Sequence, residues 1–364
     1  MVTLEIEMNQ AGQRLDKFLG KYLPEAPVSF FYKMLRKKNI TLNGKRAEGK
    51  EILQLKDQVT LWLADETILK FGGDLSTQET NSNTPWQKQN HQSKSDNTIA
   101  LYRQAYNDLQ DVGVIYEDTH VLVLDKPAGM LTQQAKAGDL SLNEWMIGYL
   151  LDTGAINSQD LRLFHPSVCN RLDRNTSGLV LCGKTLPGSQ QLSELIRTHQ
   201  IRKFYKTLCV GQLGIAGSGT VTEMQGYLQK NASTNQVVIS QQEPGDYIRT
   251  IYQILEQYGI PGEKFFFTEL EVELITGKPH QIRAHLSSMG HPLAGDPKYG
   301  DVHVNRLLQR KFNLHWQLLH AQRLEFPMLE GVLTPLSGKI LQSPLPEIYK
   351  SILAGMKACT HKSG

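Results

Sequence analysis

The stretch HPSVCNRLDRNTSGLVLCGKT, residues His165 to Thr185, sets charged residues and turn formers beside an apolar run. Three of its residues favour a tight turn, because Asn and Gly tolerate left-handed backbone and Ser bonds locally: Asn175, Ser177 and Gly178. The apolar Val180 and Leu181 that follow predict a buried strand. An aspartate at such a turn is commonly a cap, but it can also be an ionised catalytic acid. The stretch alone leaves both roles open for Asp173.

The length and composition of the whole chain predict a folded protein with more than one domain. It has 364 residues, of which 40% are hydrophobic, and a net charge of +3 that identifies no partner. No apolar run has membrane-spanning length, and MVTLEIEMNQ lacks the features of a signal peptide. We therefore expect a cytoplasmic protein without a membrane contact. The four cysteines show neither CxxC pairs nor zinc-like spacing, so we expect neither disulfides nor a metal.

The first 69 residues predict a small α+β domain. GQRLDKFLGKYL has apolar residues at the spacing of an amphipathic helix: Leu15, Phe18, Leu19 and Tyr22. Ser29 would cap a second helix, whose inward face carries Phe31, Met34 and Leu35. ITLNGKR then predicts a strand and an Asn-Gly hairpin turn, and VTLWL a closing strand.

Positive charge gathers in this amino-terminal block. Residues 29–50 contain seven Lys or Arg and one acid, Glu48. Three of the basic residues would share one face of the second helix and form a basic stripe: Lys33, Arg36 and Lys37. With RLDKFL and ITLNGKR, the block resembles the S4 RNA-binding domain, in which the second helix and the following turn dock on structured RNA. The resemblance implies that the basic stripe binds RNA; the alternative is a solvated basic face.

The two segments that follow differ sharply in composition. Residues 70–108 are polar and poor in aliphatic side chains, and they predict a flexible linker. Residues 109–355 predict a larger domain that begins with two strands in VGVIYEDTHVLVLDKPAGM. Strands dominate without a regular βαβ rhythm, so we expect an α+β fold with a mixed, largely antiparallel sheet.

Three motifs in the larger domain carry the chemistry: NRLDRNTSG, then IRKFYKTLCVG, and finally TGKPHQIRAHLSSMGHPLAGDPKYG. In this order they resemble the pseudouridine synthases of the RluA type, which isomerise selected uridines in structured RNA. The resemblance extends to VIYEDTHVLVLDKPAGM and LLHAQRLEF, and so covers nearly the whole chain apart from the linker and tail. It implies a pseudouridine synthase fold and, by analogy with relatives that carry an S4 domain, ribosomal RNA of the large subunit as substrate.

The resemblance also implies a set of site residues. The catalytic aspartate of the family matches Asp173, which would act as nucleophile or as base. The family's arginine that opposes it matches Arg283, whose planar fork can grip a carboxylate at two points. Tyr205 matches the tyrosine that packs on the target uracil; the alternative is a strand tyrosine of the core. Arg171 matches the arginine that enters the space left by the flipped uridine or pairs nearby. The reaction involves no redox change, so no cofactor is expected.

One position of the first motif departs from the family pattern. The family usually has His where this chain has Asn170, a residue that can form hydrogen bonds but cannot titrate; we expect activity to survive this difference.

The competing hypothesis is a non-catalytic RNA-binding or ribosome-assembly factor with an idle synthase fold. A nucleoside-cleaving hydrolase is a third hypothesis, but the motifs contain no water-activating group. We expect a monomer.

Overall fold

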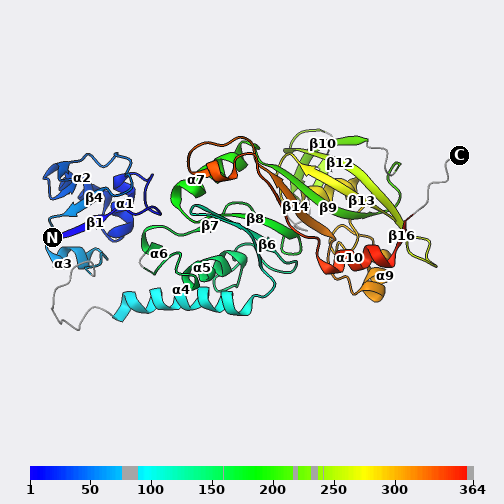
Figure 1. Cartoon of the computed structure of the whole chain (residues 1–364), viewed down its shortest axis with the longest axis horizontal. Coiled ribbons are helices and arrows are strands. Elements are labelled where there is room, and N and C mark those ends of the chain that lie inside the picture. The colour runs from blue at the N-terminus through cyan, green and yellow to red at the C-terminus, as the bar shows by residue number, and fades with distance from the viewer. Residues whose placement is uncertain (76–88, 159, 216–219, 231–236, 241, 359–364) are drawn as a thin grey trace.

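The computed structural model describes residues 1–75, 89–158, 160–215, 220–230, 237–240 and 242–358. The molecule is elongated, with the amino-terminal block at one end of its longest axis and a large sheet along the rest (Figure 1). Within the described part, no helix is long and apolar enough to cross a bilayer. Cys169, Cys182 and Cys209 are free thiols, whereas Cys359 lies outside the described residues.

The amino-terminal block is a four-stranded antiparallel sheet with helices packed on it. In sheet order its strands are β1 (Val2–Glu5), β4 (Gln58–Leu61), β2 (Ile40–Leu42) and β3 (Lys45–Arg46). Its helices are α1 (Leu15–Tyr22), α2 (Val28–Arg36) and α3 (Asp65–Lys70). The residues expected on the inward faces of the first two helices are all buried, so the helical spacing predicted them correctly. The Asn-Gly hairpin is confirmed, and Asn43 and Gly44 have φ of 50° and 71°.

The expected helix cap at Ser29 is wrong. Helix α2 begins at Val28 with Pro27 as the preceding N-cap residue, so Ser29 lies inside the first turn. Pro27 has φ of −66°, the value that its ring imposes, and no side chain caps the helix. The fixed proline backbone therefore sets the start of α2 where a hydroxyl cap was expected.

The rest of the chain is built around one sheet of twelve strands among the described residues. Its main path runs through β11 (Val237–Ser240), β10 (Val221–Lys230), β12 (Asp246–Gly259), β13 (Phe266–Leu274), β9 (Arg202–Val210), β14 (Leu319–Glu325), β8 (Ser177–Gly183), β6 (Val121–Lys126) and β5 (Gly113–Glu117). The short strands β7 (Ser167–Val168), β15 (Ile340–Gln342) and β16 (Lys357–Ala358) pair with β8, β14 and β12. All described pairs are antiparallel except β14 with β8, which confirms the expected α+β class with a largely antiparallel sheet.

Helices cover both faces of this sheet. They are α4 (Gln89–Asp108), α5 (Leu142–Asp152), α6 (Asp160–Leu163), α7 (Leu186–Arg197), α8 (Gln281–Ser288), α9 (Val302–Phe312), α10 (Glu347–Gly355) and a 3₁₀ helix at Gly331–Leu336. On β8, Val180 and Cys182 join the core under α5, whereas Leu179 and Leu181 join the core under α7. A strand buried on both faces reads as a continuous apolar run, which is why GLVLC shows no alternation.

The expected linker is wrong for residues 89–108, which form α4. Tyr102 and Ala105 are buried in the core that α5 shares, and α4 packs along α5 (Figure 1). Gly148 of α5 allows this approach, because a Cβ there would lie 2.2 Å from the Tyr102 carbonyl oxygen. The larger domain therefore includes at least the second half of α4. Residues 76–88, also assigned to the linker, lie outside the described residues.

Candidate active site

Asp173 lies in a turn, but its side-chain carboxylate does not form the hydrogen bond that closes this turn. The Thr176 amide donates to the Asp173 carbonyl oxygen at 3.0 Å, so the main chain forms the turn. Ser177 and Gly178, both expected in the turn, lie instead in strand β8, where Gly178 has φ of 109°. A Cβ on Gly178 would lie 2.3 Å from the carbonyl oxygen of Ala321 on the neighbouring strand β14. Glycine is required there by the close approach of two backbones, and the side chain of Asp173 is left free for another partner.

That partner is Arg283, which stands 110 residues further along the chain on α8. Arg283 Nη1 donates to Asp173 Oδ2 at 2.6 Å, a short charge-assisted hydrogen bond. The Arg283 side chain is only 6% exposed and that of Asp173 is 25% exposed. The guanidinium is therefore a buried partner of the carboxylate and not a charge on the helix surface.

The two-point grip expected of Arg283 is made to a different carboxylate. Arg283 Nε and Nη2 donate to Oδ2 and Oδ1 of Asp296 at 2.8 and 3.0 Å. Asp296 is fully buried, and it also accepts hydrogen bonds from the main-chain amides of Lys298 and Tyr299. Burial by itself would lower the pKa of Arg283, but the bonds and charges of Asp296 and Asp173 outweigh it and raise that pKa. Arg283 is thus a permanent cation that presents one remaining edge to Asp173.

Asp173 and Arg283 line a cavity of about 680 Å³. Five of the described lining residues are Lys or Arg, whereas Asp173 is the one acid among them. The basic ones are Arg171, Arg174, Lys203, Lys278 and Arg283. This excess of positive charge around one carboxylate suits an anionic ligand such as a nucleic-acid backbone.

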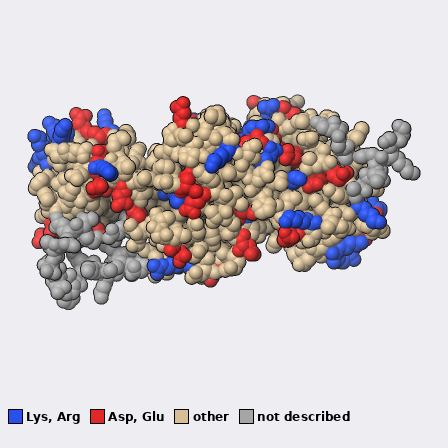
Figure 2. Space-filling view, viewed as in Figure 1, with Lys and Arg blue, Asp and Glu red and all other residues tan. Residues whose placement is uncertain are grey.

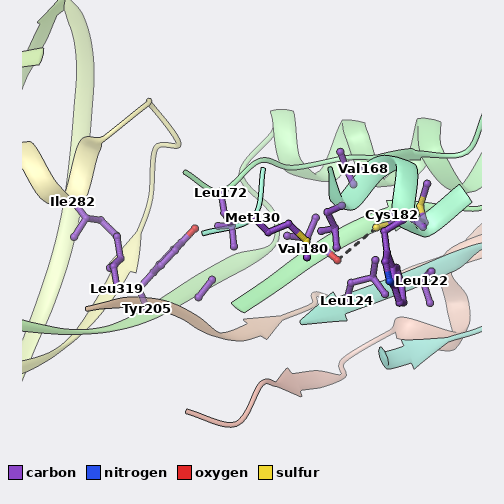
Figure 3. Packing of buried hydrophobic residues seen from close by; sticks show 14 of the residues in the cluster. Leu122, Leu124, Met130, Val168, Leu172, Val180, Cys182, Tyr205, Ile282 and Leu319 are labelled. Carbon is purple, nitrogen blue, oxygen red and sulfur yellow. Dashed lines mark hydrogen bonds between the residues drawn. The ribbon is translucent and has the colours of Figure 1, made fainter. Parts of the chain in front are cut away.

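Tyr205 connects this cavity to the hydrophobic core. It lies on β9, lines the cavity and is 7% exposed. Figure 3 shows its ring beside Leu319 and Ile282, two apolar residues that also line the cavity. Burial, reinforced by the negative charge of Asp173, raises the pKa of Tyr205, so its phenol stays neutral. The cavity therefore offers an aromatic and aliphatic wall next to its charged groups.

The remaining predicted residues fall in two places. Arg171 is exposed and lines the same cavity. Asn170 also lines it, and its Oδ1 accepts a hydrogen bond from the Leu181 amide at 2.7 Å, which ties the motif to β8. The basic stripe, by contrast, is exposed on α2 and its C-cap, at the other end of the molecule from most of the sheet (Figures 1 and 2). The structure brings Asp173, Arg283, Tyr205 and Arg171 together and leaves the stripe apart.

Lys126 supports the turn of Asp173, and the sequence reasoning missed it. Its fully buried Nζ donates to three carbonyl oxygens, those of Pro127, Met130 and Arg174, at 2.9 to 3.0 Å. Burial lowers its pKa to about 7, against the opposing charges of Asp173 and Asp125. The signal was a lysine at the end of an apolar strand, directly before Pro-Ala-Gly. Asp296 was missed too, although it stands inside the quoted third motif.

The described residues also bear on metal binding. Within the resolved ranges, no group of three or more His, Cys, Asp or Glu side chains is arranged to hold a metal ion.

Comparisons with known proteins agree on one family. Residues 120–288 match the family described as RNA pseudouridylate synthase, a range that includes Asp173, Tyr205 and Arg283. "Ribosomal large subunit pseudouridine synthase D" of Nitrosomonas europaea is 28% identical over 365 residues, which cover 100% of this chain and 90% of that protein. "Ribosomal large subunit pseudouridine synthase C" of Escherichia coli is also 28% identical, over 98% of this chain and 95% of that protein.

Solved structures show the same fold. Human RNA pseudouridylate synthase domain containing 1 has a TM-score of 0.52 and 19% identity, and it covers 69% of this chain and 89% of its own. Human RNA pseudouridylate synthase domain containing 4 has a TM-score of 0.51 and 21% identity, covering 72% and 98%.

Proposed function

We propose that this chain, whose residues 120–288 match the RNA pseudouridylate synthase family, converts particular uridines of large-subunit ribosomal RNA to pseudouridine. Two relatives named as ribosomal large subunit pseudouridine synthases match it over 98% and 100% of its length. A substrate in ribosomal RNA would place the protein in the cytoplasm. The proposed site is formed within one chain, so the proposal requires no second subunit.

We propose that Asp173 is the catalytic residue. In the isomerisation the bond from N1 of uracil to C1′ of ribose breaks, and a bond from C5 to C1′ forms. The hydrogen on C5 is lost as a proton and N1 gains one, so atoms and electrons balance without a cofactor. Asp173 would either add to C1′ or remove a ribose proton, and both roles need its ionised form. The contact with Arg283 at 2.6 Å supports that form and is the observation on which the proposal chiefly rests.

Tyr205 and Arg171 are proposed to hold the nucleotide. A uridine flipped out of its helix loses stacking, and an aromatic wall replaces that contact. Tyr205 has the required surroundings, because it is neutral, nearly buried and flanked by aliphatic side chains. Arg171 is exposed at the same cavity, where its planar cation can occupy the space that the uridine vacates.

The amino-terminal block, residues 1–69, is proposed to be an S4-like RNA-binding domain. Its support is the two-helix and hairpin arrangement together with the exposed basic stripe of Lys33, Arg36 and Lys37. Lysine and arginine on a helix surface bind phosphates, which position a protein on RNA without reading its sequence. In this scheme the block holds the RNA, and the larger domain, 109–355 with α4, performs the chemistry.

The alternative is an RNA-binding factor in which the synthase fold is idle. An idle fold would not need a buried arginine, whereas Arg283 is held by Asp296 and donates a further hydrogen bond to Asp173. Burying such a cation costs free energy unless its partners are kept, so the arrangement favours a working site.

The deciding experiment is the Asp173→Asn variant, which keeps the shape but removes the charge. We expect pseudouridine formation in ribosomal RNA, mapped by carbodiimide modification, to fall to the level of the strain without the gene. RNA binding should stay within a few-fold of the wild type. Asp152→Asn, an exposed acid at the end of α5, is the matched control and should keep full activity. Turnover by Asp173→Asn, in a preparation free of wild-type enzyme, would refute the assignment.

A further inference from the structure

His280 occupies an unusual position directly before α8. Its φ of 58° and ψ of 13° put it in the left-handed region, which residues other than glycine adopt infrequently. Its side chain lines the cavity and is 24% exposed. Its Nε2 atom is 4.0 Å from Asp173 Oδ2, which is too long for a hydrogen bond. The strained backbone thus holds an imidazole beside the carboxylate without bonding it there.

Tyr299 determines which imidazole nitrogen carries the proton. The Tyr299 hydroxyl oxygen accepts a hydrogen bond from the Val237 amide at 3.0 Å and lies 3.0 Å from His280 Nδ1. Burial raises the pKa of Tyr299, so the hydroxyl keeps its proton, and Nδ1 is the acceptor within reach. Burial also lowers the pKa of His280, against the charge of Asp173, so the ring is neutral at neutral pH. A neutral ring that accepts at Nδ1 carries its hydrogen on Nε2, the atom that faces Asp173.

We propose that His280 is a further catalytic residue, whose Nε2–H donates a hydrogen bond to a carbonyl oxygen, O2 or O4, of the target uracil. The inference rests on the proposed function. When the bond from N1 to C1′ breaks, its electron pair stays with the base, and negative charge develops on these two oxygens. A fixed donor aimed at such an atom stabilises the transition state.

The two charged groups that flank His280, Asp173 and Arg283, are less suited to this task. Each of the three guanidinium nitrogens of Arg283 already donates one hydrogen to a carboxylate, and Asp173 can only accept. The neutral imidazole of His280 has a further advantage over a cationic donor. It carries no positive charge that would neutralise the nearby Asp173 carboxylate. Tyr299 is a positioning residue, because it acts on the substrate only through the tautomer of His280.

The first test compares single-turnover rates with RNA affinity. His280→Leu removes the donor, and we expect the rate at saturating RNA to fall about 100-fold with an unchanged dissociation constant. His280→Gln places an amide N–H near the position of Nε2 and should recover part of the loss. Tyr299→Phe should lower the rate by a smaller factor than His280→Leu. His303→Leu, at an exposed histidine of α9, is the control and should match the wild type.

The second test identifies the bond itself. Sulfur is a weaker hydrogen-bond acceptor than oxygen, so RNA with sulfur in place of O2 or O4 at the target uridine should react more slowly. If His280 donates to one of these oxygens, sulfur at that position of the RNA should slow the wild-type enzyme by a larger factor than it slows the His280→Leu enzyme. Equal slowing of both enzymes by each substitution would overturn the inference, as would a wild-type rate for His280→Leu. Asp173→Asn, assayed alongside, separates the outcomes: turnover by that variant refutes the proposed function, whereas its loss with an unaffected His280→Leu refutes only the role of His280.

Discussion

At the scale of single residues, the geometry of Arg283 limits what the site tolerates. Its guanidinium is clamped by two bonds to Asp296 and reaches Asp173 with a third. A lysine ammonium has the same charge but no planar fork, so it cannot hold both carboxylates in this arrangement. The position therefore depends on shape as much as on charge.

We expect Arg283→Lys to lower the single-turnover rate about 100-fold, the size of effect seen for other electrostatic catalytic groups. The reason is that Asp173 loses a partner of fixed direction while the net charge stays the same. The measurement is tritium release from C5-labelled uridine in RNA at saturating enzyme.

The matched control for that variant is Arg249→Lys. Arg249 also grips a carboxylate, that of Glu223, at two points, but the pair is exposed and does not line the cavity. It should keep the wild-type rate. An Arg283→Lys enzyme as active as Arg249→Lys would show that the planar grip has no part in catalysis.

The sequence predicted the pair of Asp173 and Arg283 through a family resemblance, and it missed Asp296 and Lys126. The physical reason is that the missed residues act by distant contacts. Lys126 binds the carbonyl of Arg174, 48 residues away, and nothing local to Lys-Pro-Ala-Gly indicates that partner. Asp296 lies in a loop, where a carboxylate usually serves the turn itself.

At the scale of helices and strands, periodicity predicted more than composition did. The spacing in α1 and α2 identified their buried residues, because each helix packs one apolar face on a sheet. The same spacing is present in α4 and the residue after it, at Tyr102, Ala105, Tyr106 and Leu109, all of which contact the core. The polar residues between them lowered the average hydropathy and led to the incorrect expectation of a linker. Met289 shows where this periodicity ends: its spacing from Ile282 and Leu286 predicts an inward position, but it is 39% exposed because it follows the last turn of α8.

The parallel pair of β8 and β14 predicts a dependence of stability on pH. His320 on β14 is paired with Ser177 on β8, and its Nδ1 lies 2.9 Å from the serine hydroxyl. Burial, partly opposed by a bond to the Ser343 main chain, lowers the pKa of His320 from 6.5 to about 4. Between these values the unfolded chain binds more protons than the folded one, so stability is lost as the pH falls. At about 1.4 kcal/mol per pH unit, acidification from about pH 6.5 to about pH 5 should cost roughly 2 kcal/mol.

Urea unfolding at several pH values measures this contribution. His320→Asn retains a hydrogen-bonding amide near Nδ1 but cannot titrate, so its stability should fall less steeply over the same range. Parallel curves for the wild type and the variant would mean that His320 does not contribute to the acid sensitivity.

At the scale of the whole molecule, the basic stripe and the cavity belong to different parts of the chain. Figure 2 shows Lys and Arg side chains gathered at the end formed by the amino-terminal block. The block also touches the larger domain, since α1 contacts α6 and Leu163 packs against the core of the block. The described lining of the cavity nevertheless contains no residue of the block, so RNA binding by the stripe and chemistry in the cavity should respond separately to substitution.

Replacing Lys33, Arg36 and Lys37 together by Ala should weaken RNA binding and flatten its salt dependence. Each lost phosphate contact reduces the slope of log affinity against log salt by roughly 0.7 to 0.9, so three contacts reduce it by about 2 to 3. The rate at saturating RNA should stay within about two-fold of the wild type, because phosphate contacts position the RNA and take no part in the reaction.

The control for this triple variant removes the same charge elsewhere. Arg306, Arg310 and Lys311 are exposed on α9, near the opposite end of the molecule (Figure 1). Their replacement by Ala should leave the salt slope unchanged. If both triple variants change the salt slope equally, the stripe contributes only through the net charge of the protein. If the rate at saturating RNA collapses in the variant of the basic stripe, the amino-terminal block helps to form the active site.

Helix α4 limits how far apart two bound parts of one RNA can lie. Its twenty residues rise about 30 Å as a helix, whereas the same number in extended form would span up to about 70 Å. The helical form of α4 is thus about 40 Å shorter than the greatest length that its residues could span. Packing on α5 also fixes the direction of the second half of α4. An RNA that engages both ends of the enzyme must fold so that the anchored phosphates and the modified uridine lie within that shortened reach. Unpaired strands that hold the two points farther apart can occupy only one end at a time.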